Sequence, residues 1–383
     1  MAPEHRAVKA VFGQAGLDKR KAAAYTVPRK GVLGRGLRGG CIPSTSPDLG
    51  NANVGMRRKP VIFPQTGGVF AVGFWMNGRL SGVTPSRGSS AFFFKVAIAA
   101  PGAQKGEKVD FGKQLSLVRE RAPLVQCITN FVTVNDCANI VLAAGGSPSM
   151  ADDVREAAEA VRGAAALVCN LGAIAAVDAM LAAGRAANEL GRPVVLDPVA
   201  AGNTALRRQE SARLLAGVRF AAIRGNASEI RALARGELTG SGVDVSGEDA
   251  VTDATLPRTV ETARLLAKQT GAVVAVSGPI DVVTDGEQTI LLRNGCATMA
   301  RITGSGCMLT AMLGAFCGAD PGHPFEATCA AIAAMGVAGD LAEERRLRNG
   351  TGNATFRTNL IDAVFNLTEE QLNGRVRYEV YEG

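Results

Sequence analysis

From residue 111 onward the sequence alternates short apolar runs with longer alanine-rich stretches, and this alternation restricts the fold more than any other feature. A short run that is apolar at every position is typical of a strand covered on both faces. Such strands, when helices separate them, form parallel sheets with helices on both sides. Five runs predict strands: 122–130, 164–170, 193–198, 220–223 and 272–278.

The stretches between these runs have the composition and the apolar spacing of helices. They predict helices over 132–144, 152–162, 174–190, 205–216, 226–235 and 259–270. Residues 281–293 predict an antiparallel hairpin with Asp285-Gly286 at its turn, and roughly the last 80 residues return to helices. The predicted fold is therefore a three-layer α/β/α sandwich with a mostly parallel central sheet.

Residues 1–110 differ from the rest in charge and in pattern. They hold 17 Lys and Arg against 5 Asp and Glu, a net charge of +12, whereas residues 111–383 hold 25 against 30, a net charge of −5. Glycine-rich and arginine-rich runs dominate this segment, and no helical or alternating period persists. We expect a poorly ordered basic extension, either transit-like or a start-site artefact, followed by one globular domain over 111–383. We expect neither a nucleic-acid nor a membrane partner for that domain.

Histidine and cysteine usage excludes several kinds of chemistry. The chain has two histidines, His5 and His323, which disfavours a His-pair metal site and a Ser-His-Asp hydrolase. None of the eight cysteines forms a Cys-x-x-Cys pair. We expect reduced thiols and a cytoplasmic protein. Carboxylates, thiols, backbone groups or a bound metal must then supply the chemistry.

The strongest candidate site is a glycine turn in MARITGSGCMLTAMLGAFC, residues 299–317. Gly304, Ser305 and Gly306 lead into a helix, whose free backbone N–H groups and dipole favour an anion. The alternative is a tight turn whose glycines allow close packing. Cys307 follows in the first helical turn, where we expect the dipole to lower the pKa of a functional thiol. The alternative for Cys307 is an inert buried thiol.

Polar residues also follow three of the predicted strands, where ligands bind in such folds. Asp197 ends one strand before a proline, and it could hold Mg²⁺ through water or cap a helix. Arg224 leaves the next strand and could pair with phosphate, while Glu229 could help hold Mg²⁺ or complete a capping box. Ser277 and the following glycine could meet a nucleotide phosphate or form a simple turn. Together these groups predict Mg²⁺-dependent phosphoryl transfer, with the acceptor left open.

Five motifs in order carry a more specific resemblance over residues 115–367. They are PLVQCITNFVTVNDCANIVLAAGGSPSM (123–150), VVLDPVAAG (194–202), IRGNASEI (223–230), SGPIDVVTDG (277–286) and ITGSGCMLTAMLGAFC (302–317). This stretch resembles the hydroxyethylthiazole kinases, which are ribokinase-like enzymes of thiamine salvage. The resemblance implies ATP-dependent and Mg²⁺-dependent phosphorylation of the hydroxyl of 4-methyl-5-(2-hydroxyethyl)thiazole.

The resemblance also implies a role for each motif residue. The thiazole would contact Met150 and Gly304, with Asn130 in the same pocket. ATP would be bound by Arg224, Ser277 and the turn at Gly306, and Mg²⁺ by Asp197 and Glu229. Cys307 would stand in the place of the aspartate base of most ribokinase-like enzymes.

The family further implies a homotrimer with thiazole sites between subunits. Two alternatives to a thiazole kinase stay open at this point. One is another ribokinase-like kinase, for a small alcohol or for hydroxymethylpyrimidine, and the other is a catalytically silent nucleotide-binding subunit.

Overall fold

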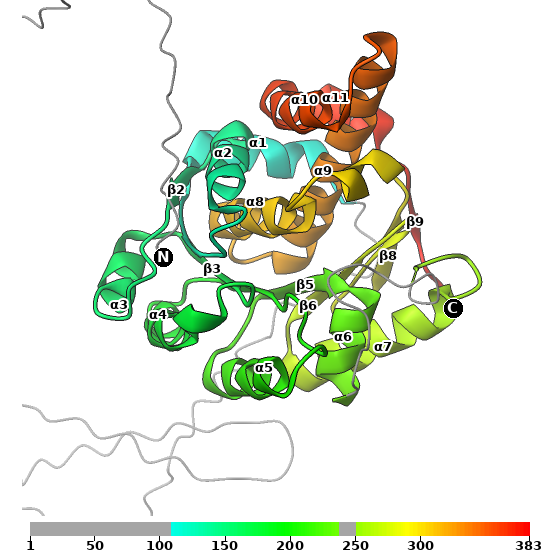
Figure 1. The fold of residues 1–383 in the computed structure, drawn as a ribbon. Coiled ribbons are helices and arrows are strands. Elements are labelled where there is room, and N and C mark those ends of the chain that lie inside the picture. Colours follow the sequence, from blue (N-terminus) through cyan, green and yellow to red (C-terminus); the bar gives the residue numbers. More distant parts are fainter. Residues whose placement is uncertain (1–108, 237–249) are drawn as a thin grey trace, which may run out of the picture. The chain divides into compact units, whose positions relative to one another are not determined.

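The computed structural model describes residues 109–236 and 250–383, so that the basic extension predicted for 1–110 lies almost wholly outside the described residues. The described residues form one sheet in the order β2-β1-β3-β4-β5-β6-β7-β8-β9 (Figure 1). Strands β1 to β6 run parallel, and β7, β8 and β9 are antiparallel to their neighbours. The strands are β1 (Leu124–Ile128), β2 (Ser147–Ser149), β3 (Ala166–Asn170), β4 (Val194–Asp197), β5 (Ala222–Asn226), β6 (Val273–Ser277), β7 (Asp281–Thr284), β8 (Thr289–Leu292) and β9 (Tyr378–Val380).

Helices cover both faces of this sheet, which confirms the three-layer sandwich (Figure 1). One apolar core lies against α1 (Phe111–Arg121), α2 (Val134–Ala144), α8 (Ser305–Ala319), α9 (Pro324–Arg348) and α10 (Asn353–Asn366), with α11 (Glu369–Arg375) beside them. The other core lies against α3 (Ala157–Ala160), α4 (Val177–Glu189), α5 (Ala205–Gly217), α6 (Ala227–Arg235) and α7 (Leu256–Thr270). Each face of the buried strands is thus removed from water by its own helical layer.

The five predicted strands and the hairpin are present, but two short strands were missed. β2 and β9 are three residues long and lie at the two edges of the sheet. β2 contains Pro148, which cannot donate a ladder hydrogen bond and is tolerated at an edge. Neither strand is long enough to leave an apolar pattern in the sequence.

The helix predicted over 152–162 is largely wrong. Only Ala157–Ala160 is α-helical, and a 3-10 turn follows at Val161–Gly163. The Asp153 carboxylate accepts the N–H of Arg155 at 2.9 Å, a local turn that competes with the first helical turn. Alanine content alone therefore overestimated this helix.

Helix α9 is long and apolar enough to cross a membrane by composition, but 83% of its apolar window is buried inside the fold. It packs against α8, α10 and α1 and reaches β7. Its apolar surface is thus accounted for as the central helix of one core.

Close packing of α8 on the sheet fixes the position of its N-terminus. A β-carbon at Gly314 would lie 2.4 Å from a methyl of Val168 on β3 and 2.9 Å from one of Val125 on β1. Only glycine allows this approach. The first turn of α8 therefore lies at the carboxyl edge of the sheet, beside the ends of β3 and β4.

Candidate functional site

The candidate site lies where the parallel strands end, because several of them place a polar side chain there. Asn170 at the end of β3 is the register partner of Asp197 at the end of β4. Asn226 at the end of β5 is the register partner of Ser277 at the end of β6. Neighbouring parallel strands thus bring residues from distant parts of the chain to one edge.

The glycine turn opens α8 as expected, and the close packing that was the alternative reason for its glycines is present. Gly304 is the N-cap residue in the left-handed region, with φ 81°, and a β-carbon there would lie 2.4 Å from the methyl of Thr133. A β-carbon at Gly306 would lie 2.5 Å from Nη1 of Arg224. The first glycine thus serves close packing, and the second lets a guanidinium approach the helix.

The first turn of α8 also keeps its capacity for an anion. Gly304 has no side chain that could cap the helix, and the first N–H groups of any α-helix lack an intrahelical acceptor. Arg224 adds its positive charge beside them. The turn therefore offers backbone donors, a helix dipole and a guanidinium at one place.

The thiol of Cys307 lies inside a cluster of amides. Nδ2 of Asn130 lies 3.3 Å from the sulfur and Nδ2 of Asn170 lies 3.2 Å from it, and both donate to it. Burial, followed by the negative charge of Asp197, raises the pKa of the Cys307 thiol, although its hydrogen bonds act in the opposite direction. The lowered pKa expected from the helix dipole is therefore wrong, because desolvation outweighs the donors.

The carboxylate of Asp197 is buried and shared by several groups. Its Oδ2 accepts Nδ2–H of Asn170 at 3.0 Å and the hydroxyl of Thr310 at 2.8 Å, and Nη1 of Arg224 lies 3.9 Å away. Burial raises the pKa of Asp197, while Arg224 and Thr310 oppose that rise. Asn170 thus connects the carboxylate of Asp197 with the thiol of Cys307.

Glu229 forms the capping box that was one of its two predicted roles. Its Oε2 accepts the N–H of Asn226 at 2.9 Å, and the Asn226 side chain accepts the N–H of Glu229 at 2.9 Å. Its Oε1 accepts the N–H of Ala200 at 2.8 Å, in the loop after Asp197. Burial and the charge of Asp197 raise the pKa of Glu229 to about 7. The two carboxylates are therefore electrostatically coupled, which fits a site for a cation.

Ser277 lies at the end of β6, on the same edge. Its hydroxyl donates to the carbonyl of Gly225 at 3.4 Å, next to Arg224. The following N–H, that of Gly278, donates to the buried Asp281 carboxylate at 3.0 Å. Burial raises the pKa of Asp281 to about 7. Ser277 thus lies beside the strand that carries Arg224, whereas the Gly278 N–H is used for a turn.

Met150 follows directly after β2, which pairs with β1 and ends at the same sheet edge. Its side chain is half-buried and packs against the core on the side of α2 and α8. Because β2 is the edge strand, Met150 lies at the end of the sheet order, two strands beyond Asn170. The first turn of α8 and the ends of β3 to β6 thus form one cluster of polar residues. Met150 lies at the margin of this cluster.

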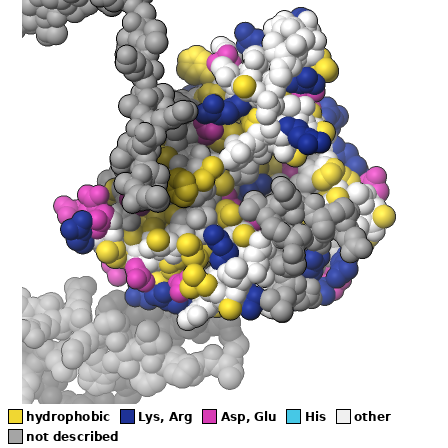
Figure 2. Space-filling view, in the orientation of Figure 1, with side chains coloured by type: hydrophobic (Ala, Val, Ile, Leu, Met, Phe, Trp, Pro, Cys, Tyr) yellow, Lys and Arg dark blue, Asp and Glu magenta, His cyan; other side chains and the backbone are white. Residues whose placement is uncertain are grey.

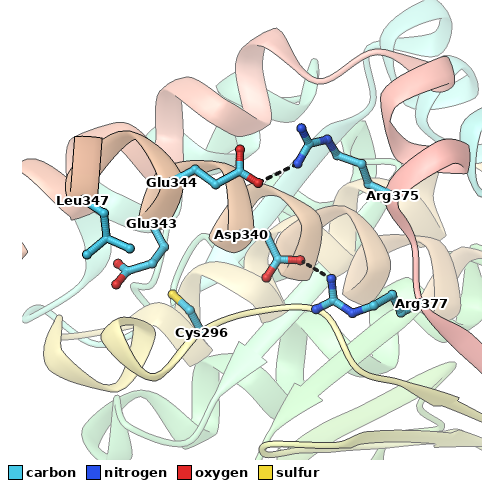
Figure 3. A pocket seen from close by; sticks show the side chains of 7 residues that line it. All are labelled: Cys296, Asp340, Glu343, Glu344, Leu347, Arg375 and Arg377. Atoms are coloured by element: carbon cyan, nitrogen blue, oxygen red, sulfur yellow. Dashed lines mark hydrogen bonds and ion pairs between the residues drawn. The ribbon is translucent and has the colours of Figure 1, made fainter. Parts of the chain in front are cut away.

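A cavity of about 450 Å³ lies away from this cluster (Figure 3). Helix α9 supplies three carboxylates and Leu347 to its wall, and the chain after residue 374 supplies two arginines: Asp340, Glu343, Glu344, Arg375 and Arg377. Two ion pairs span it, Glu344 with Arg375 at 2.8 Å and Asp340 with Arg377 at 3.1 Å. Since these charges satisfy one another, the size of this cavity does not make it the reactive site.

Two residues of the cluster escaped the sequence analysis, Asn170 and Thr310. Asn170 ends the predicted strand 164–170, so that a polar residue at a strand end was the available signal. Thr310 is a fully buried hydroxyl inside an apolar helix, one turn after Gly306. The sequence around Thr310 predicts a buried core helix. Nothing in it therefore indicated a role for Thr310 at the site.

Comparisons with known proteins agree with this architecture. Residues 115–370 match the hydroxyethylthiazole kinase family. The chain is 45% identical over 271 residues to a hydroxyethylthiazole kinase of Clostridium acetobutylicum, covering 70% of this chain and 99% of that protein. It is 49% identical over 263 residues to one of Desulfovibrio desulfuricans, covering 66% and 92%. The solved structure of a hydroxyethylthiazole kinase from Pyrococcus horikoshii matches with a TM-score of 0.61 and 34% identity, covering 71% of this chain and 99% of that one.

Proposed function

This chain belongs to the hydroxyethylthiazole kinase family, and from that membership we propose how its strand-end residues carry out the reaction. It is a phosphotransferase that moves the γ-phosphoryl group of ATP to the hydroxyl of 4-methyl-5-(2-hydroxyethyl)thiazole, in thiamine salvage. The match over 115–370 carries this conclusion, because it spans the ends of all six parallel strands, β1 to β6. The roles given below to single residues are our proposal.

Asp197 and Glu229 would hold Mg²⁺, and their chemistry fits that ion. Mg²⁺ in phosphoryl-transfer sites is bound through one or two carboxylates, water and substrate phosphates rather than by a dedicated cage. The described residues contain no cluster of three or more metal-ligating side chains, and the pair fits this sparser pattern. Burial, followed by the negative charge of Asp197, raises the pKa of Glu229, and a bound cation would favour its ionised form. When bound, Mg²⁺ would neutralise charge on the β- and γ-phosphates.

Arg224, Ser277 and the turn at Gly306 would bind the phosphates of ATP. The guanidinium of Arg224 lies against Gly306, so that its positive charge lies beside the first turn of α8. The guanidinium and the helix N–H groups are both fixed before substrate arrives, which is the arrangement that stabilises developing charge most effectively. Ser277 lies beside Arg224 on the neighbouring strand and would contact the nucleotide from that side.

Cys307 would face the acceptor hydroxyl, with Asn130, Gly304 and Met150 around the thiazole. Asn130 lies in the loop between β1 and α2, and its Nδ2 group donates to the thiol at 3.3 Å. As a thiolate, Cys307 would take the proton of the hydroxyl; as a thiol, it would orient that hydroxyl toward the phosphate, and its raised pKa favours the second role. In a loose, largely dissociative transition state the acceptor needs little activation, so that orientation is the larger part of the role.

We place the enzyme in a homotrimer whose thiazole sites lie between subunits. Next to Asn130, Phe131 is 89% exposed and Val132 is 60% exposed, an unusual position for two consecutive apolar residues. Figure 2 shows that hydrophobic side chains are exposed on the face of the molecule that it draws. Apolar surface of this kind marks an interface, and here it adjoins the proposed acceptor pocket. A neighbouring subunit that covers it would also complete that pocket.

Phe131→Glu is expected to weaken this assembly, because the substitution puts a charge into an apolar contact. The particle mass measured by light scattering during size-exclusion chromatography should fall toward that of one subunit, and the KM for the thiazole alcohol should rise. Phe365→Glu is the matched control, since Phe365 is 66% exposed on α10. An unchanged mass for Phe131→Glu would contradict the proposed interface.

The reaction itself is tested by ATP consumption in the presence and absence of candidate acceptors. We expect Mg²⁺-dependent ADP formation with the thiazole alcohol and little with hydroxymethylpyrimidine. A preference for the pyrimidine would identify another ribokinase-like kinase. ATP binding without ADP formation on any acceptor would identify a silent nucleotide-binding subunit.

We also propose a cytoplasmic location with no nucleic-acid or membrane partner. The seven cysteines among the described residues are all free thiols, as expected in a reducing compartment. Residues 111–383 carry a net charge of −5, which disfavours binding to phosphate backbones.

A further inference from the structure

The side chain of Asn170 occupies the middle of the site, although no charge or motif marks it. It is 1% exposed and ends β3, directly beside Asp197 in the sheet register. Its Nδ2 group lies 3.0 Å from Oδ2 of Asp197 and 3.2 Å from the sulfur of Cys307. One amide group thus joins the carboxylate on the metal side of the site to the thiol on the acceptor side.

The orientation of this amide is fixed by its partners. Its Oδ1 accepts the N–H of Gly172 at 2.9 Å and Nδ2–H of Asn130 at 3.3 Å. An NH₂ group has two protons, and the carboxylate and the sulfur receive them. A flipped amide would point oxygen at the Asp197 carboxylate and nitrogen at the Gly172 N–H. The hydrogen-bonding capacity of Asn170 is therefore used in a single arrangement.

The two groups that Asn170 joins depend on it unequally. Oδ2 of Asp197 keeps the hydroxyl of Thr310 at 2.8 Å, with Arg224 nearby, when the amide is removed. The sulfur of Cys307 loses one of its two amide donors. The other donor, Asn130, is itself hydrogen-bonded to Oδ1 of Asn170 and loses that support as well. After loss of Asn170 the carboxylate thus keeps the Thr310 hydroxyl and the nearby guanidinium, whereas the sulfur keeps the amide of Asn130, which is then held by Thr133.

We propose that Asn170 is a positioning residue for phosphoryl transfer, which holds the sulfur of Cys307 and the side chain of Asn130 in register with the carboxylate of Asp197. The proposal rests on the function proposed above for Cys307. The proposal predicts a kinetic effect. Asn170 acts on the acceptor hydroxyl through the thiol of Cys307 and leaves the binding of MgATP nearly unchanged.

Asn170→Leu tests this, because leucine keeps the branched shape of asparagine and removes every hydrogen bond of the amide. We expect kcat to fall by about 10²-fold, the scale of a misplaced reacting group. The KM for MgATP should stay within about threefold of the wild-type value, since a loss confined to the transition state lowers kcat alone. In a Cys307→Ala background the same substitution should lower kcat by no more than about threefold, because residues that act as a unit are not additive.

Controls separate this proposal from a loss of folding and from failure of the Cys307 assignment. Asn359→Leu changes a similarly buried asparagine on α10, 6% exposed, and should leave kcat unchanged. If Asn170→Leu fails to fold, as thermal unfolding would report, Asn170→Ala replaces it, because alanine also removes every hydrogen bond of the amide and adds no charge beside Asp197. An equal loss of kcat from the Asn170 substitution in both backgrounds would overturn the proposal alone. Full kcat in Cys307→Ala by itself would overturn the role of the thiol, and this proposal with it.

Discussion

Cys307→Ala is expected to slow turnover by about 10²–10⁴-fold, the usual contribution of a group that activates or orients the acceptor. The KM for MgATP should change little, because the nucleotide is assigned to Arg224, Ser277 and the backbone of the α8 turn. The reason is geometric: the sulfur faces Asn130 and Asn170, whereas the guanidinium lies against Gly306. Steady-state kinetics with varied ATP and varied thiazole alcohol measures both quantities.

Cys296→Ala is the control, because Cys296 is also half-buried but lines the distant cavity. Cys307→Ser then separates the two possible roles of the thiol. A serine hydroxyl can orient a neighbouring hydroxyl but is a poor base at neutral pH, so orientation predicts a much smaller loss for serine than for alanine. Abolished ATP binding in Cys307→Ala would contradict the assignment.

Asp197→Asn is expected to lower kcat/KM by roughly 10²–10³-fold, the scale on which one preorganised electrostatic group contributes. The substitution removes a negative charge from the proposed Mg²⁺ site. The amide oxygen of asparagine can still accept from Asn170 and Thr310, which both donate to Oδ2, so that the lost charge is the main effect. The concentration of Mg²⁺ at half-maximal rate should rise, which a titration of activity with Mg²⁺ measures directly.

Asp340→Asn is a suitable comparison, because Asp340 is a partly buried carboxylate with an arginine partner in the other cavity. It should leave the dependence on Mg²⁺ unchanged. A wild-type Mg²⁺ titration for Asp197→Asn would remove that carboxylate from the metal site, whatever the loss of rate.

The sheet could be predicted from the sequence because its strands are buried on both faces. Runs such as PVVLDP need no partner to be recognised, and β4 indeed covers Val194–Asp197. The two edge strands could not be predicted, because they lack such an apolar run. β2 and β9 gain their strand conformation from one neighbour, β1 or β8, and carry no pattern of their own.

Much of the candidate site could also be predicted, because polar residues after apolar strands are conspicuous. Asp197 and Arg224 were found in this way, and they lie within 3.9 Å of each other. Asn170 ends a strand in the same manner, but an asparagine is neither charged nor reactive and was counted with its strand. What it does becomes visible only when β3 and β4 are placed side by side.

The acidity of Cys307 could not be predicted from its position in the helix. Local sequence identifies a helix N-terminus, which favours the thiolate. It does not show that the thiol is enclosed beside Asp197, and these two influences raise its pKa. Burial is a property of the whole fold, so that the sign of the shift was decided by residues more than 100 positions away in the chain.

The loop after Asp197 contains a residue with a strained backbone conformation. Ala200 has φ 57°, a conformation that costs a non-glycine residue about 1–3 kcal/mol, and its N–H is held by Glu229. This hydrogen bond helps to hold the loop in the strained conformation. A movement of the Glu229 carboxylate would remove the hydrogen bond that holds the N–H of Ala200.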